Sequence, residues 1–193
     1  MLQPSEEKKV PIIRVITQST PNPHALKFIT AKDFKTKGKA TFAHPAECLH
    51  VPLASKILEI PSVTSVHFFE NVLTVNQDGE GDWPVLEEGV IKFIQEFLPT
   101  HDANFASEQE VDTTNWTEDR KKIEEIIDRT IRPGLQADGG DIEIIDFEQN
   151  LLTIRYEGAC GSCPSSQAGT LQGIESILRH EFDPHIQIAA LPA

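Results

Sequence analysis

The sequence predicts an α+β protein of two small domains, each a small β-sheet packed with helices, joined by a polar linker. Strand-length runs of β-branched and aromatic residues occur in both halves of the 193-residue chain, and apolar residues recur at helical spacing beside them. Between Leu98 and Trp116 this periodicity stops and polar residues dominate. We therefore place the first domain at residues 1–98, the linker at 99–115 and the second domain at 116–193.

The first half is predicted to contain strands and two helices. A turn at residues 21–23 separates the first two strands, because proline lacks the N–H that a strand ladder needs and asparagine favours tight turns. Residues 52–60 predict a short helix. From Asp82, a suitable N-cap, apolar residues at helical spacing predict a second one: Leu86, Val90, Phe93, Ile94 and Phe97. Extended runs predict the strands: residues 10–17, 24–30, 63–69 and 72–76.

The second half is predicted to contain a helix, a β-hairpin, a second helix and a last short strand, in that order. Thr117 can cap a helix with an acidic first turn, and the Pro-Gly pair at residues 133–134 ends it. Residues 142–147 and 151–156 predict the two strands of the hairpin, and residues 186–188 predict a last short strand. Another helix is predicted between them by apolar residues at helical spacing: Leu171, Ile174, Leu178 and Phe182.

Composition narrows the class of protein. The formal net charge is −13, which opposes binding to nucleic-acid phosphates, and no apolar run is long enough to span a bilayer. Three cysteines are too few and too uneven for a secreted disulfide framework, which favours a reducing compartment. Residues 1–9 show neither a signal-peptide nor a transit-peptide pattern. We therefore expect a cytoplasmic protein that binds neither nucleic acid nor membrane.

The chemistry of the chain is expected at a Cys-x-x-Cys loop between a strand and a helix. Two residues between Cys160 and Cys163 let both sulfurs face one side of a tight loop, and Gly161 relieves backbone crowding there. The following helix begins near Pro164, so its N-terminal dipole favours thiolate over thiol. Thiolates are the ligands that soft metals and clusters require, so Cys160 and Cys163 are the candidate metal and cofactor ligands.

Spacing alone leaves three uses of this loop open. A metal or iron–sulfur cluster site is one. A thiol-disulfide oxidoreductase, with Cys160 as attacking and Cys163 as resolving thiol, is another, although only 30 residues follow Cys163 and a thioredoxin-like motif precedes a longer stretch of domain. A structural zinc module is the third, although zinc needs four protein ligands and the chain has no second Cys-x-x-Cys.

A family resemblance favours the cluster. Three blocks of the second half resemble the NifU C-terminal domain: residues 132–141 (RPGLQADGGD), 157–166 (EGACGSCPSS) and 170–175 (TLQGIE). Three blocks of the first half resemble the Nfu N-terminal domain: residues 20–28 (TPNPHALKF), 52–54 (PLA) and 60–63 (IPSV). Together these blocks lie along most of the chain.

The resemblance implies an iron–sulfur cluster scaffold or carrier and not an enzyme. It implies a 4Fe-4S cluster held between two subunits by Cys160 and Cys163 of each, so the implied partners are a second copy of the chain, an upstream cluster assembly scaffold and apo iron–sulfur client proteins. The ligand count agrees, because a cubane cluster takes four thiolates and this loop supplies two.

Other side chains could mislead. Cys48 lies between His44 and His50, but a single cysteine beside a helix is more typical of a buried apolar residue than of a metal ligand. Asp138 and Asp141 flank two glycines and predict a turn rather than a calcium loop. Four lysines predict a solvated loop, with client docking as the alternative: Lys32, Lys35, Lys37 and Lys39.

Overall fold

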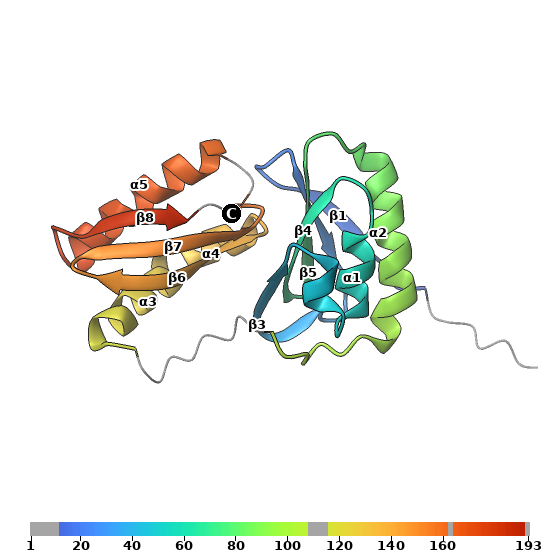
Figure 1. Ribbon diagram of the computed structural model, residues 1–193, viewed down its shortest axis with the longest axis horizontal. Coiled ribbons are helices and arrows are strands. Elements are labelled where there is room, and N and C mark those ends of the chain that lie inside the picture. Colours follow the sequence, from blue (N-terminus) through green and yellow to red (C-terminus); the bar gives the residue numbers. More distant parts are fainter. Residues whose placement is uncertain (1–11, 108–115, 162–163, 192–193) are drawn as a thin grey trace, which may run out of the picture.

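The structure, a computed structural model, describes residues 12–107, 116–161 and 164–191. It contains two β-sheets, each with its own hydrophobic core and its own helices. Figure 1 shows the two sheets side by side, with the helices of the first half on the face that points away from the second half. The α+β class and the two-sheet arrangement predicted from sequence are therefore confirmed.

The first sheet has five antiparallel strands in the order β1-β2-β5-β4-β3. Their bounds are β1 Ile16–Ser19, β2 Ala25–Ile29, β3 Lys35–Phe42, β4 Val63–Glu70 and β5 Val72–Gln77. The helices of this half are η1 Pro45–Cys48, α1 Pro52–Leu58, α2 Trp83–Phe97 and η2 Leu98–Thr100. Pro52 and Pro84 stand in the first turns of α1 and α2, where a missing N–H costs no helix bond.

The two faces of the first sheet have different chemistry. One row across the strands is apolar and forms the core with α1 and α2: Phe28, Leu73, Phe68 and Ala40. The next row is polar and lies on the opposite face: Lys27, Thr74, His67 and Thr41. Lys27, Thr74 and His67 are nevertheless buried. The second half of the chain covers this row and supplies a partner to Lys27, whose Nζ donates to Ala137 O.

The second sheet has three strands in the order β6-β7-β8: β6 Gly140–Glu148, β7 Leu151–Gly158 and β8 Gln187–Leu191. Strands β6 and β7 form the predicted hairpin, whereas β8 runs parallel to β7. A parallel neighbour needs a crossover, and α5 (Pro164–Glu181) provides it. With α3 (Glu118–Thr130) and α4 (Arg132–Ala137), α5 covers a core of isoleucines and leucines: Ile123, Ile127, Ile142, Ile154 and Leu178.

The structure corrects three details of the sequence reasoning. Strand β3 was expected to be a solvated lysine loop. Residues 12–15 are not a strand, and the Ile13 N–H instead donates to Gln95 of α2 at 2.8 Å. The Pro133-Gly134 pair ends α3 as predicted, but it also opens α4, because proline is tolerated in a first helical turn.

The division into a domain at 1–98, a linker at 99–115 and a domain at 116–193 stays a prediction. Within the described residues, the chain after Leu98 contacts the first half. Phe105 is buried in the first core, and its carbonyl accepts a hydrogen bond of 2.9 Å from Lys35 Nζ. None of the described helices is long and apolar enough to cross a membrane.

Candidate functional site

The first cysteine of the motif lies in a tight turn at the end of β7. Backbone hydrogen bonds close this turn, from Cys160 N to Glu157 O at 3.3 Å and from Gly161 N to Gly158 O at 3.1 Å. Gly158 has φ +57°, a conformation that side chains with a Cβ rarely adopt. Cys163, the other predicted ligand, lies outside the described residues, and α5 begins at the residue after it, as predicted.

A pair of glycines at the start of β6 forms the floor beneath Cys160. Ala159 N donates to Gly139 O at 3.0 Å, and Gly139 has φ +81°. A Cβ added at Gly140 would lie 2.3 Å from Cys160 Sγ and 2.9 Å from its backbone nitrogen. The sulfur therefore rests directly on bare backbone, and a side chain at residue 140 would collide with Cys160. The turn predicted around Asp138 and Asp141 is confirmed.

One side chain of α5 holds the loop from the other side. Gln167 Nε2 donates to the carbonyls of Cys160 and Gly161 at 3.2 and 2.9 Å. The Gln167 carbonyl in turn accepts from Tyr156 Oη at 3.0 Å. Burial and, secondarily, the nearby Cys160 raise the pKa of Tyr156 to about 12, so its hydroxyl stays a donor at neutral pH. These contacts fix the path of the loop independently of any ligand.

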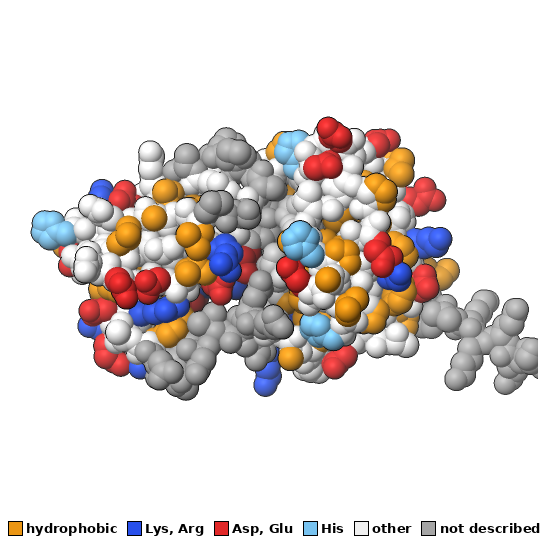
Figure 2. Space-filling model, in the orientation of Figure 1, with side chains coloured by type: hydrophobic (Ala, Val, Ile, Leu, Met, Phe, Trp, Pro, Cys, Tyr) orange, Lys and Arg blue, Asp and Glu red, His pale blue; other side chains and the backbone are white. Residues whose placement is uncertain are grey.

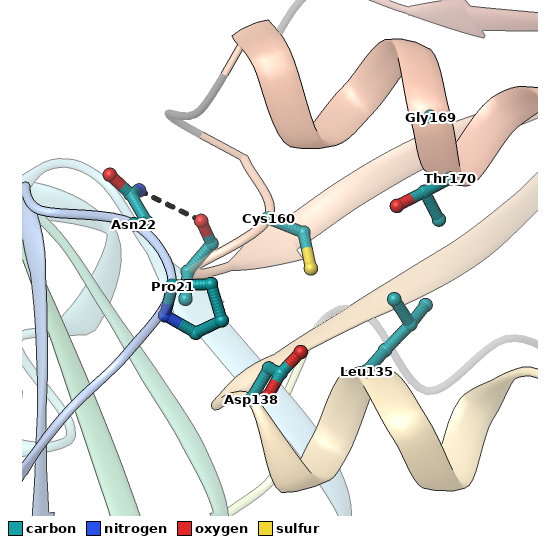
Figure 3. A pocket seen from close by; sticks show the side chains of 8 residues that line it. Pro21, Asn22, Leu135, Asp138, Cys160, Gly169 and Thr170 are labelled. Carbon is teal, nitrogen blue, oxygen red and sulfur yellow. Dashed lines mark hydrogen bonds between the residues drawn. The ribbon is translucent and has the colours of Figure 1, made fainter.

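The thiol of Cys160 points into a small pocket (Figure 3). The pocket has a volume of about 280 Å³, and Cys160 itself is 8% exposed. Its walls come from both halves of the chain: Leu135, Asp138 and Thr170 from the second, and Pro21 and Asn22 from the first. Leu135 and Thr170 lie on the helices that pack on the second sheet, whereas Pro21 and Asn22 belong to the turn before β2.

Side chains of the first half bind the backbone that leads to Cys160. Asn22 Nδ2 donates to Ala159 O, and Asn76 Nδ2 donates to Gly158 O, both at 2.8 Å. Lys27 Nζ donates to Ala137 O at 2.6 Å. Two consecutive carbonyls of the cysteine loop thus accept hydrogen bonds from two asparagines that lie more than 80 residues earlier in the sequence.

A lysine joins the two halves beside this loop. Lys39 Nζ lies 2.5 Å from Glu157 Oε2 and 3.3 Å from Asp141 Oδ1, and both carboxylates are buried. Burial alone would raise the pKa of Asp141, but Lys39 and Arg132 lower it below its usual value. Thr41 Oγ1 also donates to Glu157, at 3.3 Å. Glu157 is therefore held by two side chains of β3.

The lysine-rich segment was thus interpreted wrongly from the sequence. Lys35 is buried and lies 4.7 Å from the centre of the Phe105 ring, and Lys32 Nζ donates to the Leu98 carbonyl at 2.6 Å. Only an alternation of lysine and threonine signalled a strand, and that pattern also fits a solvated loop. Cys48 agrees with its prediction: it is buried in the first core, and burial raises its pKa to about 11.

Among the described residues, no three histidine, cysteine, aspartate or glutamate side chains lie together in a way that could hold a metal ion. On the face shown in Figure 2, acidic and basic side chains are interspersed over both halves of the described chain. Sequence reasoning did not predict the contacts that four side chains make with the cysteine loop: Asn22, Asn76, Lys39 and Gln167. Asn22 lay within a quoted family block, but nothing local indicated that it contacts Ala159.

Comparison with known proteins identifies the family. The profile described as "NifU-like domain" matches residues 123–189, and the profile described as "Scaffold protein Nfu/NifU N terminal" matches residues 15–101. The chain belongs to the NifU-like family. This Nfu-type chain is 34% identical over 172 residues to NifU-like protein 4, mitochondrial, of Arabidopsis thaliana, covering 85% of this chain and 61% of the relative.

A human relative and a solved structure match the chain as well, over different lengths. The chain is 34% identical over 167 residues to the human NFU1 iron-sulfur cluster scaffold homolog, mitochondrial, covering 84% of this chain and 66% of the relative. A solution NMR structure of a NifU-like protein from Saccharomyces cerevisiae aligns with a TM-score of 0.43 and 25% identity, over 51% of this chain and 89% of that one. The Nfu-type chain spans about three fifths of the length of the first curated relatives it matches.

These relatives correct the predicted location. A cytoplasmic protein was expected, and that prediction is wrong, because the matching proteins of Arabidopsis and human are named as mitochondrial. The physical reason is that a small number of cysteines indicates a reducing compartment but does not show which reducing compartment it is. Location is read from targeting segments by receptors and is not encoded in the chemistry of the cluster loop.

Proposed function

We propose that this chain is an iron–sulfur cluster scaffold and carrier that binds a 4Fe-4S cluster through Cys160 and Cys163. One observation carries the proposal: the Cys160 thiol lies on a tight loop, over the bare backbone of Gly140, a few residues before α5 begins. The proposal is supported by the names of relatives, among them an iron-sulfur cluster scaffold homolog in human. Thiolates of this kind are the ligands that iron–sulfur clusters require.

The cluster is shared by two copies of the chain. A cubane cluster takes four thiolates, and the sequence contains three cysteines. Cys48 is buried in the first core, so the second half contributes two thiols, Cys160 and Cys163, and two chains contribute four. A twofold dimer is the simplest closed arrangement that supplies this number.

The cluster is cargo rather than a resident group. Thiolates of an acceptor protein replace those of the carrier one at a time, and for each iron–sulfur bond that forms one breaks, without electron transfer. An upstream assembly scaffold supplies the cluster and apo iron–sulfur proteins receive it, so no reaction on an organic substrate is needed and the chain is not an enzyme. Few ligands per chain suit this exchange, because each subunit gives up only two bonds.

Ligand substitution tests the proposal directly. Cys160→Ser and Cys163→Ser should each abolish stable cluster binding after anaerobic reconstitution with iron and sulfide, measured by absorption and Mössbauer spectroscopy. Cys48→Ser is the matched control and should bind as the unchanged chain does, with about four iron and four sulfide per dimer. A stable full cluster on a monomer would contradict the shared site. Rapid reduction of insulin disulfides without cluster delivery would replace the carrier with a thiol-disulfide oxidoreductase.

A further inference from the structure

We infer that the polar face of the first sheet, together with the turn before β2, is a docking surface for the cysteine loop of the same chain. Its occupant is the segment at residues 157–160, and it covers the Cys160 thiol in the cluster-free chain. The corollary that this segment leaves the surface when a cluster is taken up rests on the proposed function.

The surface is specific for this segment. Successive elements of the segment each have their own partner on the first half. Lys39 lies 2.5 Å from the Glu157 carboxylate, Asn76 binds the Gly158 carbonyl at 2.8 Å, and Asn22 binds the Ala159 carbonyl at 2.8 Å. The two asparagine amides bind consecutive carbonyls, so they fit only one path of the backbone. The lysine requires an acidic side chain at the first residue of the segment.

Glycine at the centre of the segment permits this close approach. A Cβ added at Gly158 would lie 3.1 Å from Cδ2 of His67, on the polar face, and 2.5 Å from Gly139 O. A Cβ added at Gly139 would meet the Lys27 side chain at 2.7 Å. Both glycines therefore lie against side chains of the first sheet, so the two surfaces fit each other in shape as well as in charge.

Docking and a shared cluster exclude each other at Cys160. For a shared cluster, the thiolates of a second chain must bind the same cluster as this sulfur. Cys160, however, is only 8% exposed. Pro21 and Asn22 form the walls of its pocket that come from the first half. The other walls belong to the helices and turn of the second half, whose apolar side chains form a core that would be costly to open. The first half is the cover that can move.

The contact between the halves has the character of a reversible interface. Its bonds are polar, and polar bonds exchanged for bonds to water contribute little net free energy. Within the described residues, His67 Nε2, Thr74 Oγ1 and Asn76 Oδ1 are buried in or beside it without a hydrogen-bond partner, which weakens the closed arrangement. A cavity of about 680 Å³ also lies between the halves, lined by residues of both, including His24, His44 and Arg155.

Access to Cys160 tests the docking surface without any cluster. Lys39→Met keeps the aliphatic stem and removes the charge, leaving Glu157 without its cation. Lys37→Met is the matched control, because Lys37 lies on the same strand and is exposed. The reduced, cluster-free full chain is treated with iodoacetamide, and mass spectrometry follows alkylation at each cysteine. We expect Cys160 to react at least about tenfold faster in Lys39→Met than in the unchanged chain, and Lys37→Met to match the unchanged chain.

Two further measurements keep the outcome unambiguous. Cys48, in the first core, reports unfolding, so faster alkylation of Cys48 as well would show that Lys39→Met unfolds the chain; Lys27→Met, which loses only the bond to Ala137 O, then decides by the same comparison. An unchanged rate at Cys160 in folded variants overturns the docking surface. The rate of cluster loading should rise with the alkylation rate. Equal loading by all variants overturns the corollary, and no loading by any chain overturns the proposed function while alkylation still decides the docking surface.

Discussion

Adding a single methyl group at Gly140 should test whether the cysteine loop depends on the bare backbone beneath it. In Gly140→Ala the new Cβ would lie 2.3 Å from Cys160 Sγ and 2.9 Å from Cys160 N. The sulfur could rotate away, but the backbone nitrogen can only move with the loop, which Gln167 and Gly139 hold in place. Overpacking of this kind costs about 1–3 kcal/mol. We therefore expect a lower unfolding temperature, by about 2–4 °C for each kcal/mol in a chain of 193 residues.

The matched control is the same substitution where the structure leaves room. Gly173 lies inside α5, and a Cβ there would meet nothing within 4 Å. Alanine is the better helix former by about 0.8–1 kcal/mol, so Gly173→Ala should raise stability. Thermal unfolding of the cluster-free proteins by circular dichroism measures both signs, and anaerobic reconstitution measures cluster capacity. If Gly140→Ala unfolds at the same temperature as the unchanged chain and binds as much cluster, the position of Cys160 does not depend on the backbone beneath it.

Two other predictions follow from buried polar groups and helix ends. Burial lowers the pKa of His67 from its ordinary 6.5, outweighing Glu157 and Asp141, which raise it. Only the unfolded chain then binds this proton between the two pKa values, so stability is complete above pH 6.5 and falls as the pH drops through the folded pKa. Urea unfolding should be measured from about pH 7.5 to about pH 5. The free energy of unfolding should fall less steeply in His67→Gln than in the unchanged chain. Thr117→Ala, which removes the bond from Arg120 N, should cost about 1 kcal/mol by the same method; no change would mean that the cap is dispensable.

Elements with strong local patterns were predictable. The hairpin β6–β7 and the helices α2, α3 and α5 each carry an apolar stripe with one clear period, and the structure contains each of them. Strand β3 could not be predicted in the same way, because its exposed-looking lysines alternate with small or polar residues rather than with a run of β-branched ones. Its lysines are held by groups distant in the chain, such as Phe105 O and the Glu157 carboxylate.

The cysteine loop was predictable in position and only in part in its surroundings. The spacing of Cys160, the glycines of the Gly139–Gly140 pair and Pro164 indicate a tight turn before a helix, since these residue types act on their own backbone. The use of the turn by two chains is a proposal, and Cys163 lies outside the described residues. Gln167 was not singled out, although its amide holds two carbonyls of the loop.

By itself the sequence determined the fold class, because periodicity and turn chemistry act over a few residues, and the family, because motif blocks in both halves resemble it. Only the tertiary structure decided that the polar face of the first sheet would be buried. Asn76 and Gly158 are 82 residues apart, and Asn22 and Ala159 are 137 apart. A polar row looks alike in sequence whether water or another sheet covers it, since its side chains can be satisfied by either. The partner is chosen only when both surfaces have folded and fit each other.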